Sequence, residues 1–195
     1  MKISEARQIY GAQIREYRQQ QTELLKQKQA LEKKMKADPN GKALYEEEAA
    51  TLELTINAVE EKQNEYRKYM EKLTEQWAAT ANMESAEQQG DAMAEYAEDM
   101  AKIMEVARRL MKGAIVPPTD EKKLMEYSME LYQAAKSMGM MERHRKREEY
   151  DSLWQEEEPK DYADPMEVAD NAEAFAPGPE VVDVADTMAS VTEPE

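Results

Sequence analysis

The sequence contains no cysteine, and it has one histidine, one phenylalanine and two tryptophans among its 195 residues. Without cysteine the chain can form neither a disulfide nor a thiolate metal site. No apolar run approaches the roughly 20 residues that a membrane-spanning helix needs. The first residues, Met1–Ser4, lead into a polar stretch and not into a classical signal peptide. We therefore expect a cytoplasmic protein without a membrane span, with export by a non-classical route as the alternative.

Strand signals are also missing before the C-terminal region, because no alternating β-branched run lies between turn residues there. Glu, Gln, Lys, Ala and Met dominate instead, a composition typical of a charged helical chain and not of a sheet-containing enzyme. The length predicts one or two small domains. We predict an all-α fold.

Negative charge is concentrated at one end of the chain. The formal net charge is −16, and residues 155–195 hold 13 acidic residues against the single Lys160, which gives that region −12. Residues 1–154 therefore carry only −4. The acidity belongs mainly to the C-terminal region, and arguments from a uniformly polyanionic chain do not apply.

A heptad pattern runs through residues 3–80, where apolar positions are spaced alternately by four and three. A turn sequence at 38–41 interrupts the pattern. Residues on its two sides pair so that their numbers add to 80, as for Leu24 with Ile56, and the midpoint is Asn40. This symmetry predicts a long antiparallel coiled-coil hairpin over residues 1–84. Its predicted seam consists of Tyr10, Ile14, Tyr17, Leu24, Leu31, Met35, Tyr45, Leu52, Ile56, Val59, Tyr66, Met70, Leu73 and Trp77.

Several seam positions are polar, among them Arg7, Gln21, Lys28 and Gln63. The long basic side chains can lay their methylene groups along the apolar stripe and keep their charges in water. A buried glutamine without a partner would be costly. An incompletely apolar seam of this kind indicates that a third helix covers part of the hairpin.

Residues 85–154 predict a second, shorter helical hairpin. Ser85 and Gly90 favour a bend within 82–91, and a helix then runs to about Lys112. A linker at 113–119 contains two prolines, and Thr119 or Asp120 is placed to cap the last helix. Methionines recur on both predicted helices; helical spacing favours core packing, and a docking surface for partners is the alternative. The candidate partner-binding methionines are Met100, Met104 and Met111.

Residues 155–195 predict a disordered acidic tail, because low hydrophobicity and high charge do not offset the entropy of ordering. Two apolar islands interrupt it. Asp164-Pro165 has the residues of a helix start, which predicts a helix that forms on a partner. The second island spans 181–191. The candidate partner-binding residues of the two islands are Met166, Phe175, Val181, Val184 and Met188.

Catalytic and metal-binding patterns are not found. His144 lies within the basic run 143–147, without the orienting carboxylate and nucleophile that a catalytic histidine needs. The glutamate clusters of the hairpin lack a histidine three residues on, so the di-iron pattern is missing. We expect no enzyme activity, no metal and no cofactor. The run forms a candidate basic patch of Arg143, Arg145, Lys146 and Arg147. Pairing with a helix end or neighbouring glutamates is favoured over contact with a phosphate or an acidic partner.

These patterns predict a non-enzymatic helical interaction protein, that is, an adaptor, a scaffold or an assembly chaperone. Such a protein would bind other proteins through its helical surfaces and its acidic tail. One alternative is an acidic mimic or regulator of a nucleic-acid-binding protein. Another is a self-associating assembly factor of a virion or secretion machine. Direct nucleic-acid binding is not expected.

Overall fold

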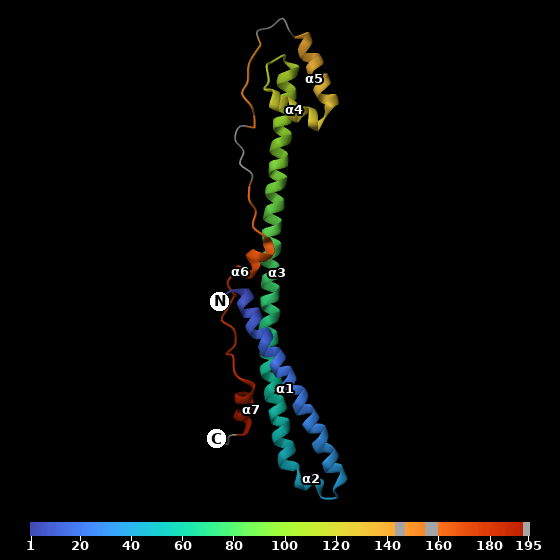
Figure 1. Cartoon of the computed structure of the whole chain (residues 1–195), viewed down its shortest axis with the longest axis vertical. Helices are drawn as coiled ribbons and strands as arrows, with labels where there is room; N and C mark the ends of the chain where they lie inside the picture. Colours follow the sequence, from blue (N-terminus) through green and yellow to red (C-terminus); the bar gives the residue numbers. More distant parts are fainter. Residues whose placement is uncertain (143–146, 155–159, 193–195) are drawn as a thin grey trace. The chain divides into compact units, whose positions relative to one another are not determined.

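The computed structural model describes residues 1–142, 147–154 and 160–192, and these residues contain helices and isolated bridges but no strand. The all-α prediction is confirmed (Figure 1). The helices are α1 (Ile3–Ala37), α2 (Gly41–Leu44), α3 (Glu46–Met111), α4 (Pro118–Tyr127), α5 (Met129–Met141), α6 (Pro165–Asn171) and α7 (Val184–Thr192). The chain divides into two compact units, which we call the hairpin unit (Met1–Glu84 with Ala163–Glu195) and the second unit (Ser85–Tyr162).

The hairpin unit contains the predicted antiparallel pair, formed by α1 and the first part of α3 (Figure 1). Cross-contacts follow the predicted register closely: the rings of Tyr10 and Tyr69 lie 4.8 Å apart, and Lys28 pairs with Glu53 at 3.2 Å. All predicted seam residues are at least half-buried. Tyr10, Tyr17, Leu24, Leu31, Ile56, Val59, Tyr66 and Leu73 are buried, and Ile14, Met35, Tyr45, Leu52, Met70 and Trp77 are half-buried.

The turn between the two long helices contains the short helix α2. The Asp38 carboxylate accepts a hydrogen bond from the Asn40 backbone N–H at 2.9 Å, as expected for a turn-forming aspartate. Gly41 is buried, and a Cβ there would lie 2.4 Å from the carbonyl oxygen of Met35. The turn therefore needs glycine because the end of α1 approaches it too closely for a side chain.

The bend expected within 82–91 is wrong, because α3 continues from Glu46 to Met111. Neither Ser85 nor Gly90 removes a backbone donor as proline would. A glycine inside a helix costs only about 1 kcal/mol relative to alanine, which is less than the cost of interrupting the helical hydrogen bonds. A Cβ at Gly90 would meet nothing within 4 Å, so packing does not require the glycine either.

The second unit packs the end of α3 against α4, α5 and residues 147–154. Its buried core consists of Val106, Ala107, Leu110, Val116, Leu124 and Ala135. Gly113 adopts the left-handed conformation just past α3, with φ of 73°, as the helix-end signal predicts. The predicted last helix is two helices, since the chain is extended at Ser128, whose side chain caps α5 by accepting from the Leu131 backbone N–H.

The methionines of this unit do not form its core. Met93, Met104, Met129, Met138, Met140 and Met141 are exposed, whereas Met100, Met111 and Met125 are half-buried. Core packing of the methionine set is therefore wrong, because shorter branched and small side chains fill the space between the helices. Asp120, expected as a helix cap, is fully buried and accepts hydrogen bonds from the Ser152 hydroxyl and the Leu153 backbone N–H.

Disorder of the acidic tail is not confirmed. The described tail residues form α6, an extended segment and α7, and α1 contacts both helices (Figure 1). The sequence predicts a third helix over part of the hairpin; the covering element is instead this part of the chain, which is extended between the short helices α6 and α7. We call residues 163–192 the tail segment. Residues 155–159 and 193–195 of the predicted tail lie outside the described residues.

Candidate functional site: a tyrosine-lined groove on the hairpin

Four tyrosines line a groove between α1 and α3. Tyr10 and Tyr17 occupy the same position in successive heptads of α1. Tyr66 and Tyr69 lie on the facing part of α3. Their rings are buried and pack edge to face or tilted, with Tyr17 and Tyr66 5.5 Å apart between ring centroids. Aromatic pairs prefer such geometry, and a buried tyrosine needs a hydrogen-bond partner for its hydroxyl. The residues packed around these rings are mostly apolar, so the hydroxyls point out of the seam into the groove.

The tail segment lies along this groove and supplies the partners. Its extended part follows the direction of α1, since Tyr10 meets Pro179 while Tyr17 meets Val182. The tyrosine hydroxyls donate to four backbone carbonyl oxygens: Tyr69 to Ala176 at 2.8 Å, Tyr10 to Pro179 at 2.8 Å, Tyr66 to Glu180 at 3.0 Å and Tyr17 to Val182 at 3.0 Å. In this stretch the groove thus contacts mainly the main chain of the tail segment.

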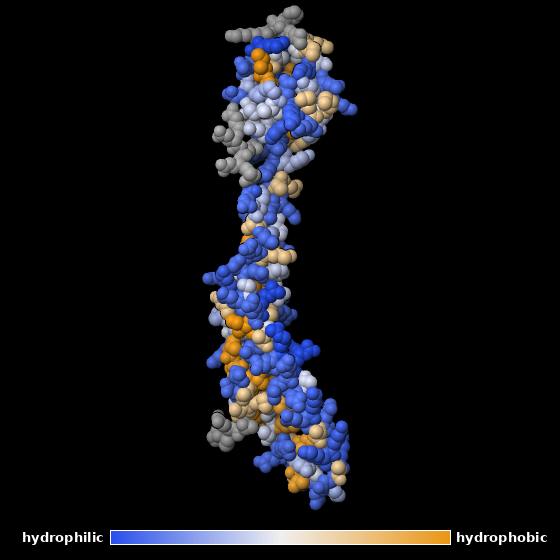
Figure 2. All heavy atoms as spheres, viewed as in Figure 1, coloured by the Kyte–Doolittle hydropathy of each residue, from blue (hydrophilic) through white to orange (hydrophobic). Residues whose placement is uncertain are grey.

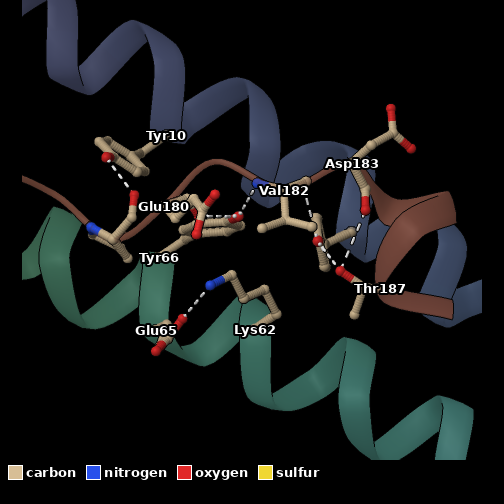
Figure 3. Close-up of polar contacts among 10 residues, drawn as sticks. Tyr10, Lys62, Glu65, Tyr66, Glu180, Val182, Asp183 and Thr187 are labelled. Atoms are coloured by element: carbon tan, nitrogen blue, oxygen red, sulfur yellow. Dashed lines mark hydrogen bonds and ion pairs between the residues drawn. The ribbon is translucent and has the colours of Figure 1, made fainter. Parts of the chain in front are cut away.

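Tyr66 makes the most complete of these contacts. Its hydroxyl donates to the Glu180 carbonyl oxygen and accepts from the Val182 backbone N–H, both at 3.0 Å (Figure 3). It therefore pairs with one donor and one acceptor of the extended segment, as a neighbouring strand would. The Tyr17 hydroxyl also lies 2.6 Å from the Thr187 hydroxyl, which connects the groove to the first turn of α7.

Gln76 extends the same type of contact toward α6. Its side-chain amide donates to the Glu173 carbonyl oxygen at 2.8 Å and accepts from the Phe175 backbone N–H at 2.9 Å. On the opposite side, the Ile3 backbone N–H donates to the Ala172 carbonyl oxygen at 2.9 Å. That N–H belongs to the first turn of α1, where helical donors lack partners within the helix. The tail segment is thus bonded from both walls of the groove.

Side chains anchor the two ends of the tail segment. Near α6, the Asp170 carboxylate accepts from the Trp77 indole N–H at 2.7 Å and lies 3.9 Å from the Arg7 guanidinium. Ala169 is fully buried, and Val184 of α7 joins the hairpin core with an exposed fraction of 6%. Between these anchors the contacts are mainly to the backbone.

Gly178 makes the closest approach to the groove wall. A Cβ at this position would lie 2.0 Å from the Tyr10 hydroxyl oxygen and 2.4 Å from the ring carbon that bears it. Real Cβ atoms do not approach other atoms so closely, so any other residue would displace the tail segment or Tyr10. Pro177 and Pro179 flank this glycine and have no backbone N–H.

Burial holds three of the groove hydroxyls, those of Tyr10, Tyr17 and Tyr69, in their donor form. Desolvation raises the pKa of Tyr17 to about 12, and the Thr187 hydrogen bond opposes this only in part. Desolvation is also the main cause that raises the pKa of Tyr10 and of Tyr69. Lys62 lies beside Tyr66 (Figure 3), and the hydrogen bond from Lys62 to Glu65 is the main reason that its pKa is raised. At neutral pH, Tyr10, Tyr17 and Tyr69 therefore present neutral hydroxyls to the tail segment.

An open groove of about 780 Å³ continues between α1 and α3 beside Met188. Leu24, Leu31 and Leu52 line it together with polar side chains. Figure 2 shows apolar surface running between the hydrophilic faces of the hairpin unit. The end of the tail segment, at Met188, thus lies beside a longer groove with both polar and apolar lining.

The predicted partner-binding residues of the tail have different environments. Val184 and Met188 pack against the hairpin core, and the Phe175 ring, although 49% exposed, lies 5.5 Å from the Tyr69 ring. Met166 and Val181 are exposed. The predicted helix start is confirmed, since the Asp164 carboxylate accepts from the Met166 backbone N–H at 2.8 Å. This helix forms on the chain's own hairpin and not only on a separate partner.

The remaining predicted sites that the structure describes belong to the second unit. Met100, Met104 and Met111 belong to the second unit, where Met104 is exposed. Arg147 is exposed, whereas Arg143, His144, Arg145 and Lys146 lie outside the described residues. Sequence reasoning missed Gln76, Tyr69 and Gly178. Repeated tyrosines in an apolar seam were a usable signal, because their hydroxyls must find partners beyond that seam.

The fold and groove define the class of this chain as an all-α protein with an antiparallel coiled-coil hairpin whose groove holds an extended segment. Comparisons with models of protein families, with curated proteins and with solved structures found no match. Among the residues that the structure describes, no group of three or more His, Asp or Glu side chains is arranged to hold a metal ion. None of the described helices combines the length and the apolar character of a membrane span.

Proposed function

We propose that this chain is a non-enzymatic interaction protein, an adaptor, scaffold or assembly chaperone, whose hairpin groove binds extended segments of partner proteins. The observation that supports this proposal is the row of hydrogen bonds from Gln76 and the four groove tyrosines to the main chain of residues 173–182. Main-chain contacts give affinity for a segment of suitable shape, and a few side-chain pockets add specificity.

In this proposal the tail segment is an internal ligand that covers the groove until a partner replaces it. A ligand on the same chain competes at an effective concentration that depends on the length and stiffness of its connection. A partner must therefore bind tightly, or the tail segment must first be released. This competition makes binding adjustable and keeps the buried tyrosine hydroxyls paired in the absence of a partner.

The experiment uses the full-length chain with Gly178→Ala, which forces the tail segment away from Tyr10. A fluorescent peptide of residues 164–192 is added, and binding is measured by fluorescence anisotropy. We expect saturable binding to the variant and at least roughly tenfold weaker binding to the unmodified chain, whose own tail segment competes.

The matched control is Gly90→Ala, because a Cβ there meets nothing within 4 Å and the groove is untouched. This control is expected to bind the peptide as weakly as the unmodified chain does. Helix content measured by circular dichroism checks that each variant remains folded. If the folded Gly178→Ala chain binds no peptide, the groove is not a site for segments supplied by another molecule, and the proposal fails.

A further inference from the structure

The groove requires a glycine in the segment that it holds, at the point where the main chain passes Tyr10. We infer that the partner segment is an acidic, extended stretch containing Pro-Gly-Pro, with the glycine placed against Tyr10. This inference rests on the function proposed above and identifies which segments the groove accepts.

The donors and acceptors of the groove favour prolines at this point. Around Gly178 the hairpin offers hydroxyl donors, from Tyr69 to the Ala176 carbonyl oxygen and from Tyr10 to the Pro179 carbonyl oxygen. The Pro179 carbonyl oxygen accepts one of these bonds. Neither Pro177 nor Pro179 has an N–H that would be left unpaired in the groove. Proline also restricts the free segment to extended conformations, which lowers the entropy lost on binding.

The glycine requirement is steric. The Gly178 backbone lies so close to Tyr10 that a Cβ would stand 2.0 Å from the hydroxyl oxygen and 2.8 Å from a ring carbon. Tyr10 cannot move away easily, because it is buried between the rings of Tyr66 and Tyr69. The site thus distinguishes glycine from every residue that has a side chain.

Charge along the groove favours an acidic segment. Arg7 lies 3.9 Å from Asp170, and the Lys2 ammonium donates to the Asn171 side chain at 2.8 Å. Lys62 lies on the wall of the groove below Glu180 (Figure 3). Arg7 of α1 thus faces one acidic side chain of the tail segment. Lys62 of α3 interacts electrostatically with Glu180 while it forms its ion pair with Glu65 of its own helix. Such complementarity gives specificity and faster association more than it adds affinity.

These features restrict only part of the sequence of the partner segment. Apart from the anchors at its ends, the tail segment contributes backbone carbonyl oxygens and N–H groups that any extended chain has. A partner needs the central Pro-Gly-Pro, acidic flanks and small residues, whereas its other side chains are free to vary. The tail segment of a second copy is the competing occupant.

The test measures binding of four peptides to the full-length Gly178→Ala chain. They are the native 164–192 sequence, the same with Gly178→Ala, the same with Pro177→Ala and Pro179→Ala, and a peptide that keeps residues 176–180 within scrambled acidic flanks. We expect binding weaker by roughly tenfold to a hundredfold for the alanine-for-glycine peptide, because it inserts a methyl group into a packed site. The proline-free peptide is expected to lose roughly fivefold or more. The scrambled peptide should remain a ligand.

A compensating change in Tyr10 separates direct contact from general loss of structure. Tyr10→Leu removes the hydroxyl and the ring carbon that a Cβ at position 178 would strike. In the full-length Tyr10→Leu, Gly178→Ala chain, hydrogen exchange in residues 172–184 should slow again toward that of the unmodified chain. A merely structural role for Tyr10 would instead make exchange faster still, and that result would overturn the inference.

The outcomes distinguish this inference from the proposed function. If the alanine-for-glycine peptide or the proline-free peptide binds as tightly as the native peptide, the inference is overturned, but the groove remains a peptide-binding site. Absence of binding by all four peptides overturns both. Light scattering of the unmodified chain gives the remaining outcome. A dimer that the native peptide converts to monomer would assign the groove to a second copy and overturn the assignment to another protein.

Discussion

Tyrosine serves two purposes in this hairpin, because its ring fills an apolar seam and its hydroxyl remains available at the edge of that seam. Tyr17 and Tyr66 are fully buried, yet their hydroxyls meet the backbone of residues 180–182. Phenylalanine would fill the same space and leave the backbone groups of the tail segment without partners. An unpaired buried polar group costs about 1–3 kcal/mol, so the hydroxyls favour the covered groove.

Tyr66→Phe removes one donor and one acceptor from the groove. We expect docking of the tail segment to weaken by about 1–2 kcal/mol, since two hydrogen bonds are lost with little change in packing. The Val182 backbone N–H donates a hydrogen bond to the Tyr66 hydroxyl, so hydrogen exchange at this amide should become faster in the variant. Tyr96→Phe is the control, because that ring is 67% exposed in the second unit. Unchanged exchange at Val182 would contradict the observed hydrogen bond.

Alkaline pH should release the tail segment through ionisation of Tyr17. The raised pKa means that folding favours the neutral phenol, so the stabilisation is complete below the unfolded pKa of about 10 and is lost as the pH rises to about 12. Near-ultraviolet absorbance of tyrosinate should show a late step that Tyr17→Phe abolishes. In concentrated urea this late step should also vanish. If it persists in the unfolded chain, burial is not its cause.

At the scale of the elements, the heptad pattern decides which side of each long helix is buried. Polar residues in the seam find specific partners: the Gln63 side-chain amide is buried and donates to the Ile14 carbonyl oxygen at 3.2 Å. Lys28 lies at the seam edge and pairs with Glu53. These contacts explain how an incompletely apolar stripe still pairs in one register.

Leu24 and its neighbour Leu25 offer a matched test of the seam. Leu24 is 2% exposed in the hairpin core, whereas Leu25 is 43% exposed. Leu24→Ala should lower the free energy of unfolding by about 2–4 kcal/mol through lost burial and a residual cavity. Leu25→Ala should change it by no more than about 0.5 kcal/mol. Urea denaturation followed by circular dichroism measures both, and equal effects would contradict the seam.

Helix α5 approaches the end of α3 at a second glycine. A Cβ at Gly139 would lie 2.1 Å from the Leu110 carbonyl oxygen. Gly139→Ala should therefore destabilise the second unit by about 1–3 kcal/mol, because rigid backbone is in the way. Gly90→Ala, with open space around it, should stabilise α3 by about 0.5–1 kcal/mol. Hydrogen exchange in α5 reports the first change, and a stable Gly139→Ala variant would contradict the close contact.

At the scale of the whole molecule, the chain returns to its first helix after the entire second unit. Met1–Ile3 and residues 172–174 form an isolated antiparallel bridge, in which Lys2 faces Glu173. The Ile3 backbone N–H donates to the Ala172 carbonyl oxygen, and the Ala174 N–H donates to the Met1 carbonyl oxygen. These two hydrogen bonds flank the pair of Lys2 and Glu173. In such a pair the two Cα atoms lie about 4.5 Å apart. The tail segment thus closes a loop that includes most of the sequence.

A disulfide should lock this arrangement. The chain has no cysteine, so Lys2→Cys with Glu173→Cys creates one pairing at a Cα distance that suits a disulfide. We expect the disulfide to form without distortion of the backbone and to raise the free energy of unfolding by about 2–4 kcal/mol. The locked chain should no longer bind the 164–192 peptide. Mass spectrometry and anisotropy measure these effects. Lys2→Cys with Glu180→Cys is the control, since seven further extended residues place its partner roughly 20 Å away. Equal oxidation of both pairs would contradict the docked tail.

The sequence by itself determined the antiparallel hairpin, its turn and its buried seam, because heptad spacing and turn residues act between neighbours along the chain. It also predicted the helix start at Asp164, which depends on a local hydrogen bond. Local patterns misplaced a bend in α3, since the cost of Gly90 is smaller than the cost of breaking a helix. They also assigned the exposed methionines to a core.

Only the tertiary structure decided the position of the tail segment. Composition counts charge and hydrophobicity, and on those terms residues 163–192 do not offset the entropy of folding. Their binding energy comes from tyrosine hydroxyls and a glutamine more than 90 residues away in the sequence. Such hydrogen bonds between distant side chains and backbone leave no periodic pattern. The complementarity between Gly178 and Tyr10 exists only when both are brought to one groove.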